Sequence, residues 1–357
     1  MPTKILDYSL IPELQPAFGL WQQYKPDFAP YHFNAGNRAE AEAWQAVTRP
    51  VLQEAIGFQD LPPAPLESQL VEEVDKGDYV RQKIVLRTWR DALMPVYLLI
   101  PKGIQTPRPA VVAFHGHGIG VKAIVGLTKN GRERRLPQGY QKDFAVALCR
   151  HGFVVAAPEI SCFGERQTDF SYLDKTIGQH APTTCTHTAR LASHLGGSVV
   201  GLRVWDGRRL IDYLQTLTFV NPAAIGAMGI SGGGLHTFFS TCMDERIRAC
   251  VVSGYFCTFK ESILAMDHCA CNFIPGLAKF GEMYDLAGLI APRPMLVESA
   301  SRDEIFPRPG VEESVERALK VYEVFGEADQ FETDYFEGEH EINGKRAYDF
   351  LREKLGE

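Results

Sequence analysis

The sequence has no long hydrophobic run and almost no clustered positive charge. No stretch of the 357 residues approaches the roughly 18 consecutive apolar residues that a membrane-spanning helix needs. The formal net charge is −7, and the only basic cluster is the short stretch RERR at 132–135. Nucleic-acid-binding proteins usually neutralise phosphates with clustered Lys and Arg. The sequence therefore predicts a protein that binds neither membranes nor nucleic acids.

The features of a secreted, disulfide-stabilised protein are also missing. The first residues, MPTKILDYSLIPELQ, lack a basic start, an apolar run and a small-residue cleavage site. The eight cysteines are scattered through the predicted strands and helices without a regular framework. We therefore expect reduced, mostly buried thiols and a cytoplasmic protein. Nothing in the sequence predicts an oligomeric state.

The chain changes character near residue 80. Residues 1–79 are rich in aromatic, proline and polar residues, and one helical pattern covers NRAEAEAWQAVTRPVLQEAIGF. Pro50 is expected to kink or divide this helix, because proline lacks a backbone donor and clashes with the preceding turn. We expect a helical N-terminal extension over 1–79 and one larger domain over 80–357.

The larger domain alternates between strand and helix patterns. YVRQKIVLRT and MPVYLLIP predict an antiparallel hairpin. The following short runs are apolar on both faces, which is typical of parallel strands covered by helices on each side. These runs are AVVAFH (110–115), GFVVAAP (152–158), AIGAMGI (224–230), ACVVSG (249–254) and PMLVES (294–299). The pattern predicts an α/β fold with a mostly parallel, doubly wound sheet, whose active site lies beyond the carboxyl ends of the strands.

Ser231 lies in the stretch AMGISGGGLH, between a predicted buried strand and a predicted helix. A Gly-x-Ser-x-Gly sequence in this context predicts a sharp turn that exposes a nucleophilic serine. Gly229 and Gly233 occupy the flanking positions where strand and helix must approach closely. The alternative interpretation is a glycine loop that only eases helix packing.

A serine hydroxyl needs a positioned base, and on this fold the order along the chain is Ser, then Asp or Glu, then His. Asp303 follows the strand PMLVES, and His340 follows the last predicted strand, FETDYFEG. Glu304 is a rival for the acid, but Asp303 comes first after the strand, and Glu304 suits the start of the next helix. A surface carboxylate and a surface histidine are the alternatives for these positions.

Acyl transfer also needs N–H donors for the developing oxyanion. The backbone N–H of Gly232 is one predicted donor. The turn after the strand AVVAFH contains FHGHG, and we assign the second donor to the backbone N–H of His117. The imidazoles of His115 and His117 are expected to pack or hydrogen-bond within that turn.

The sequence resembles the α/β-hydrolases, and more closely the bacterial esterases grouped with dienelactone hydrolases and acetyl xylan esterases. The resemblance spans roughly 80–357, which it identifies as the catalytic domain. It is carried by the motifs FHGHG, PEISCFGER, GISGGG, LIAPRPMLVESASRDEIFP and FEGEHE. The family's triad falls on Ser231, Asp303 and His340, although dienelactone hydrolases have a cysteine where this chain has the serine.

The resemblance implies a serine esterase for short-chain esters of small molecules, acetylated carbohydrates included. A serine peptidase or amidase and a non-catalytic binding protein remain alternatives.

Two segments combine cysteine with histidine, but neither has a typical zinc-ligand spacing. They are MDHCACNF, with His268, Cys269 and Cys271, and TTCTHTARLASHLGG, with Cys185, His187 and His194. The sequence therefore predicts no metal and no organic cofactor. The long connections 119–138 and 160–195 are expected to form pocket walls together with part of the extension. Phe163, Phe170 and Tyr172 are candidates for the lining.

Overall fold

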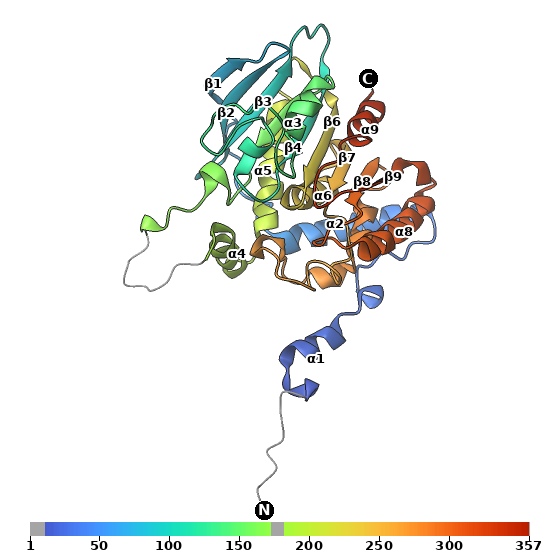
Figure 1. The fold of residues 1–357 in the computed structure, drawn as a ribbon. Helices are drawn as coiled ribbons and strands as arrows, with labels where there is room; N and C mark the ends of the chain where they lie inside the picture. Colours follow the sequence, from blue (N-terminus) through green and yellow to red (C-terminus); the bar gives the residue numbers. More distant parts are fainter. Residues whose placement is uncertain (1–10, 173–181, 357) are drawn as a thin grey trace, which may run out of the picture.

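The computed structural model describes residues 11–172 and 182–356, which form a nine-stranded sheet with helices on both faces (Figure 1). The order of the strands across the sheet is β1-β2-β3-β5-β4-β6-β7-β8-β9. The strands are β1 (Gln69–Asp75), β2 (Tyr79–Trp89), β3 (Ala92–Pro101), β4 (Arg108–Phe114), β5 (Val154–Pro158), β6 (Val220–Ile230), β7 (Ile247–Ser253), β8 (Met295–Ala300) and β9 (Phe331–Phe336).

Two helices precede the sheet in the chain, and from β4 onward helices alternate with strands. The helices are α1 (Pro16–Gln23), α2 (Arg38–Ile56), α3 (Phe144–Arg150), α4 (Thr184–His194), α5 (Val199–Leu214), α6 (Gly232–Met243), α7 (Met283–Leu286), α8 (Arg308–Phe325) and α9 (Ala347–Leu355). Helix α4 falls within the connection 160–195, for which no helix was predicted. Within the described ranges, no helix is long and apolar enough to cross a membrane.

The sheet has an antiparallel beginning and a parallel body. Strands β1, β2, β3 and β5 pair antiparallel, whereas β5, β4, β6, β7, β8 and β9 pair parallel in that spatial order. The predicted hairpin and the doubly wound sheet are therefore confirmed, and the topology is that of an α/β-hydrolase. Strand β1 was not predicted, because it is an edge strand whose residues are mostly exposed and show no apolar run.

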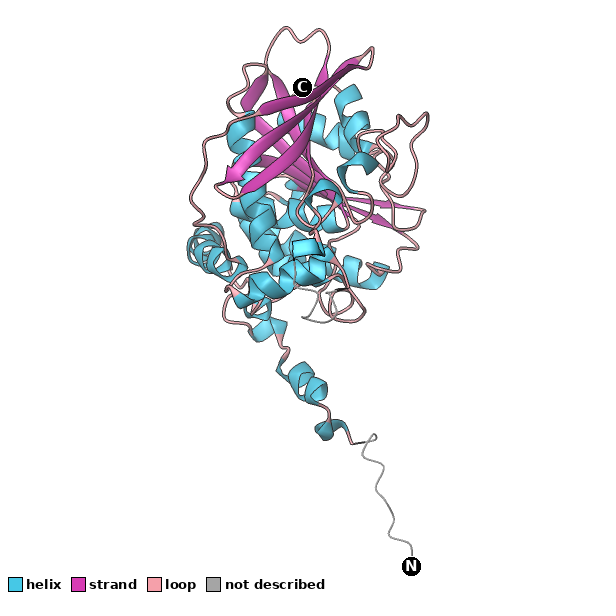
Figure 2. Ribbon diagram, turned by 90° about the vertical axis from the view of Figure 1, so that its left-hand side faces the viewer, coloured by secondary structure: helices cyan, strands magenta, loops and turns pink. Residues whose placement is uncertain are grey.

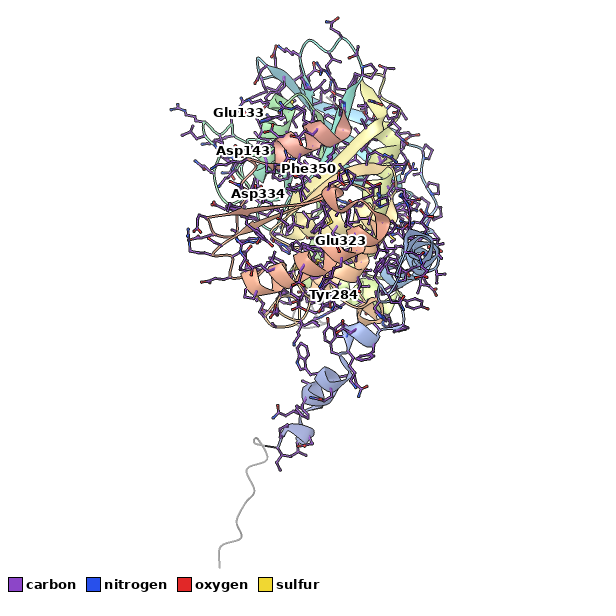
Figure 3. The ribbon with its side chains drawn as sticks, turned by 90° about the vertical axis from the view of Figure 1, so that its right-hand side faces the viewer. Glu133, Asp143, Tyr284, Glu323, Asp334 and Phe350 are labelled. Carbon is purple, nitrogen blue, oxygen red and sulfur yellow. The ribbon has the colours of Figure 1, made fainter. Side chains whose placement is uncertain are left out.

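Two hydrophobic cores fill the two faces of the sheet. On one face, Leu52 of α2, Leu210 of α5 and Phe238 of α6 belong to the larger core. On the other face, Leu148 of α3 and Phe350 of α9 belong to the second core. Figure 3 labels Phe350 on α9 and Glu323 on α8. Because both faces are covered, the central strands β4, β5, β6 and β7 are buried along most of their length.

The two N-terminal helices differ in how they contact the rest of the chain. Helix α1 has no buried residue and projects away from the body in both Figure 1 and Figure 2. Helix α2, in contrast, contributes buried residues to the larger core. It begins at the Asn37 cap and continues through Pro50 to Ile56, so the expectation that Pro50 divides it is wrong. Packing against the body offsets the loss of one backbone hydrogen bond.

Candidate active site

Ser231 occupies the sharp turn between β6 and α6. Its backbone angles are φ 58° and ψ −123°, a combination that is strained for any residue other than glycine. Its backbone N–H donates to the carbonyl oxygen of Ser253 at the end of β7, with an N···O distance of 3.1 Å. The turn therefore presents the serine beyond the carboxyl ends of the central strands, where an α/β sheet places its active site.

Close packing around the turn explains its glycines. A Cβ on Gly233 would overlap the carbonyl group of Phe114, and one on Gly229 would overlap the carbonyl group of Gly233. A Cβ on Gly232 would lie 2.7 Å from Nδ1 of His117. The last contact places the segment after β4 directly beside the residue that follows Ser231.

Asp303 and His340 form a hydrogen-bonded pair beyond β8 and β9. Oδ2 of Asp303 lies 2.7 Å from Nδ1 of His340. The other carboxylate oxygen of Asp303 accepts the backbone N–H groups of Ile305 and Phe306 at 2.9 and 3.0 Å. These bonds fix the carboxylate, and the carboxylate in turn orients the imidazole. Glu304, the rival acid, is exposed.

Nε2 of His340 is buried and has no hydrogen-bond partner within the described parts of the chain. The ring of His340 stacks between those of Tyr140 and Phe306, with centroids 5.4 and 5.8 Å away. His340 and Ser231 line the same pocket. An imidazole held at Nδ1 and unpaired at Nε2 is suited to accept a proton from a group in that pocket.

The pocket has a volume of about 460 Å³. The segment after β7 contributes five residues to its wall, Met266, Asp267, His268, Cys269 and Asn272. The lining residues are His117, Tyr140, Ser231, Gly232, Tyr255, Met266, Asp267, His268, Cys269, Asn272, Ile305, Phe306 and His340.

The predicted pocket walls are wrong as far as the described residues show. None of the described residues in 119–138, 160–195 or the N-terminal extension lines this pocket. Phe163 instead packs edge-on against the ring of His117, and Phe170 packs edge-on against His187. Part of the second predicted wall, 173–181, lies outside the described residues.

Residues 115–121 carry the predicted second oxyanion donor, and we call them the oxyanion loop. This loop is held by side chains from other segments of the chain. The hydroxyl of Tyr140 donates to the carbonyl oxygen of His117 at 2.6 Å. The side-chain oxygen of Gln141 accepts the N–H of Gly116 at 2.7 Å, and Glu159 accepts the N–H of Val121 at 3.0 Å. The backbone N–H groups of His117 and Gly232 donate to no other described residue, so both are available to a ligand.

Buried polar groups beneath the loop have shifted pKa values. Burial would raise the pKa of Glu159, but the hydrogen bond from His115 and the backbone N–H of Val121 hold it below its ordinary value. Burial would lower the pKa of His117, but hydrogen bonding with the sulfurs of Cys269 and Cys271 raises it to about 9. Both imidazoles of the loop therefore have partners beyond the turn itself.

Comparison with known proteins places the chain in a family. The model of the Abhydrolase family matches residues 14–349. The chain belongs to this family. It is 27% identical over 282 residues to YtaP of Bacillus subtilis (strain 168), a protein provisionally named a hydrolase, and the match covers 76% of this chain and 86% of YtaP.

Solved structures share the fold at low sequence identity. One is a Bacteroides fragilis NCTC 9343 protein provisionally assigned as an acetyl xylan esterase, with a TM-score of 0.74 and 18% identity over 90% of this chain and 82% of that one. Another is a glucuronoyl esterase from Solibacter usitatus, with a TM-score of 0.64 and 17% identity over 88% and 94% of the two chains.

Several residues that build the site were given no role of their own by the sequence analysis. Tyr140, Gln141 and Glu159 support the oxyanion loop, while Met266 and Ile305 line the pocket. Glu159 follows β5 immediately, so the rule that functional groups follow strand ends could have found it. The others carry no comparable signal, because their roles depend on which distant segment they meet.

Proposed function

We propose that this protein is a serine esterase that hydrolyses short-chain, acetyl-type esters through an acyl-enzyme intermediate. The observation that carries the proposal is the pairing, in one pocket, of a serine on a strained turn with a histidine whose Nδ1 is held by a buried carboxylate and whose Nε2 is unpaired in the described chain. Membership of the Abhydrolase family supports an ester-hydrolysing enzyme.

The reaction follows from the roles of these groups. His340 accepts the proton of the Ser231 hydroxyl as its oxygen attacks the ester carbonyl carbon, and the N–H groups of Gly232 and His117 stabilise the oxyanion. His340 then gives the proton to the departing alkoxide, which leaves an acyl-serine and an alcohol. Water, deprotonated by the same histidine, attacks the acyl group, releases the acid and restores the serine. Asp303 stabilises the imidazolium in both steps.

The lining of the pocket favours substrates with a small acyl group. Its wall combines the apolar side chains of Met266 and Ile305 with the polar side chains of Asp267, His268 and Asn272. Each buried methylene gains about 0.8 kcal/mol only where the surrounding wall is apolar. We therefore expect acetate and propionate esters to be preferred over octanoate and longer esters. A rise of kcat/KM with acyl length up to octanoate would contradict this preference.

The alcohol is proposed to be a carbohydrate. The support is that proteins sharing the fold are named acetyl xylan esterases. A panel that sets acetylated sugars beside simple acetate esters of equal acyl length tests this part separately.

The test of the mechanism is Ser231→Ala, with Ser240→Ala on α6 as the matched control. With p-nitrophenyl acetate we expect S231A to lose at least about 10³-fold in kcat/KM, because nucleophile and base act as a unit. S240A should keep its activity.

A fluorophosphonate probe should label the wild type and S240A but not S231A. Full activity in S231A would overturn the mechanism, and a folded wild type that takes no label would favour the non-catalytic alternative. Faster hydrolysis of aminoacyl amides than of esters would favour the amidase.

A further inference from the structure

Three cysteines and one histidine from three separate segments of the chain converge at the oxyanion loop. Nδ1 or Nε2 of His117 and the sulfurs of Cys185, Cys269 and Cys271 all lie within 4.8 Å of one another. Sγ of Cys271 lies 3.3 Å from Sγ of Cys269 and 3.6 Å from Nε2 of His117. We call these four residues the thiol cluster.

The geometry points to a tetrahedral Zn²⁺ site made by the thiol cluster. Zn–S bonds of about 2.3 Å and Zn–N bonds of about 2.0 Å would separate the ligand atoms of a tetrahedral site by about 3.5 to 3.8 Å. The two printed distances within the cluster, 3.3 and 3.6 Å, are close to that range. Three cysteines and one histidine are an established ligand set for structural zinc.

The surroundings fit the charge of such a site. Zn²⁺ would displace the protons of the three thiols to solvent, and one dipositive ion with three thiolates and a neutral imidazole carries a net charge of −1. Arg203 of α5 is fully buried and interacts electrostatically with the sulfurs of Cys271 and Cys185. Its Nε and Nη1 have no hydrogen-bond partner in the described chain. Its Nη2 donates to the carbonyl oxygen of Ser161 at 3.4 Å, and no carboxylate of the described chain pairs with it. A buried cation without an anionic partner is costly, so the anionic zinc site would compensate its charge.

The position of the cluster indicates what the metal would do. Cys185 belongs to α4, and Cys269 and Cys271 belong to the segment after β7, where Cys269 lines the pocket. Helix α4 packs against the turn at 270–272. His117 belongs to the oxyanion loop, and its ring contacts the position of Gly232. One ion would therefore join three segments that share no backbone pairing, and it would fix the loop that supplies an oxyanion donor. The consequence for catalysis rests on the proposed function, whereas metal binding does not.

The test is the metal content of the full chain, purified without a polyhistidine tag. The variants are Cys185→Ser and Cys271→Ser, and Cys149→Ala is the matched control because that buried cysteine lies in the core on the other face of the sheet. Elemental analysis should find about one zinc per chain in the wild type and in C149A. Zinc should be lost in C185S and C271S.

Cobalt substitution keeps the test independent of whether the cysteine variants fold. Wild-type protein stripped with a chelator and reloaded with Co²⁺ should show thiolate-to-cobalt charge transfer and the intense visible bands of tetrahedral coordination. Chelation should also lower the melting temperature of the wild type.

Wild-type protein that holds no zinc and gives no tetrahedral cobalt spectrum would overturn the proposal. So would a disulfide among these cysteines, detected by peptide mapping without reductant. None of these measurements requires esterase activity, so a failed proposed function and a failed metal site are distinguishable.

Discussion

The proposed triad, Ser231, Asp303 and His340, and the oxyanion loop, residues 115–121, are held in place by different kinds of contact. The backbone does most of the positioning in the triad, since Ser231 is bonded to the neighbouring strand and Asp303 accepts N–H groups two and three residues further along. The oxyanion loop depends on side chains from elsewhere, such as Tyr140 and Glu159.

This difference separates two ways of damaging the site. A change in the triad removes a reacting group, or the group that orients it. A change beneath the loop leaves the proposed nucleophile and base intact but moves the donors proposed to stabilise the transition state. Effects of the first kind should be large, and effects of the second kind should be smaller and confined to kcat.

Asp303→Asn should have the largest effect. The amide cannot stabilise the imidazolium and would favour the wrong tautomer, so we expect kcat for p-nitrophenyl acetate to fall by about 10⁴. Glu304→Gln is the matched control and should leave kcat nearly unchanged, because Glu304 is exposed. If E304Q is inactive while D303N is not, the acid has been assigned to the wrong residue.

Gly232→Ala should have the next largest effect, because Gly232 lies where the turn of Ser231 meets the oxyanion loop. The added Cβ would lie 2.7 Å from Nδ1 of His117 and would push the oxyanion loop away. Loss of one aligned donor costs about 10²–10³ in kcat. Gly19→Ala, where a Cβ meets nothing within 4 Å, is the control for steady-state kinetics. Normal kcat in G232A would show that the loop tolerates displacement.

Tyr140→Phe should have a modest effect on catalysis. It removes the hydrogen bond of 2.6 Å to the carbonyl oxygen of His117 and keeps the ring that stacks on His340. Because one such bond contributes about 1 kcal/mol, kcat should fall about fivefold with little change in KM. Tyr322→Phe on α8, whose buried hydroxyl donates to the carbonyl oxygen of Arg293 at 2.8 Å, controls for loss of a hydrogen-bonded hydroxyl. A rise of KM alone would indicate that Tyr140 binds substrate instead.

Glu298→Gln should have the smallest effect on activity but should change the pH dependence of stability. Glu298 is buried beneath the triad, where it accepts hydrogen bonds from the hydroxyl of Ser253 and the N–H of Gly344 at 2.7 and 2.6 Å. Burial raises the pKa of its carboxyl group from 4.5 to about 7. Between pH 4.5 and about pH 7, the folded protein therefore keeps a proton on Glu298 that the unfolded chain has released.

The sign of the effect follows from this raised pKa. The stabilisation is fully present below the unfolded-state pKa and is lost as the pH rises through about 7. The free energy of unfolding, measured with urea, should fall between about pH 5 and about pH 8, and this fall should be smaller in E298Q by about 2 kcal/mol. Exposed Glu323→Gln should show the wild-type fall. Identical curves for E298Q and wild type would contradict the assignment.

The sequence by itself determined the doubly wound sheet and the places where functional groups follow strands. These features depend on local signals, because a buried parallel strand needs a continuous apolar run and the turn after β6 needs glycines around Ser231. Position after a strand and order along the chain also singled out Asp303 and His340, which the structure brings within 2.7 Å of each other.

Only the tertiary structure decided the pocket wall, the supports of the oxyanion loop and the thiol cluster. Loops 119–138 and 160–195 are long enough to reach the pocket, yet the segment after β7 forms its wall. Strands β6 and β7 lie between Cys185 and Cys271 in the sequence, and no ligand spacing connects these cysteines to His117. The physical reason is that periodicity and spacing describe neighbours along one element, whereas side chains from separate loops meet only after the strands that carry those loops have paired.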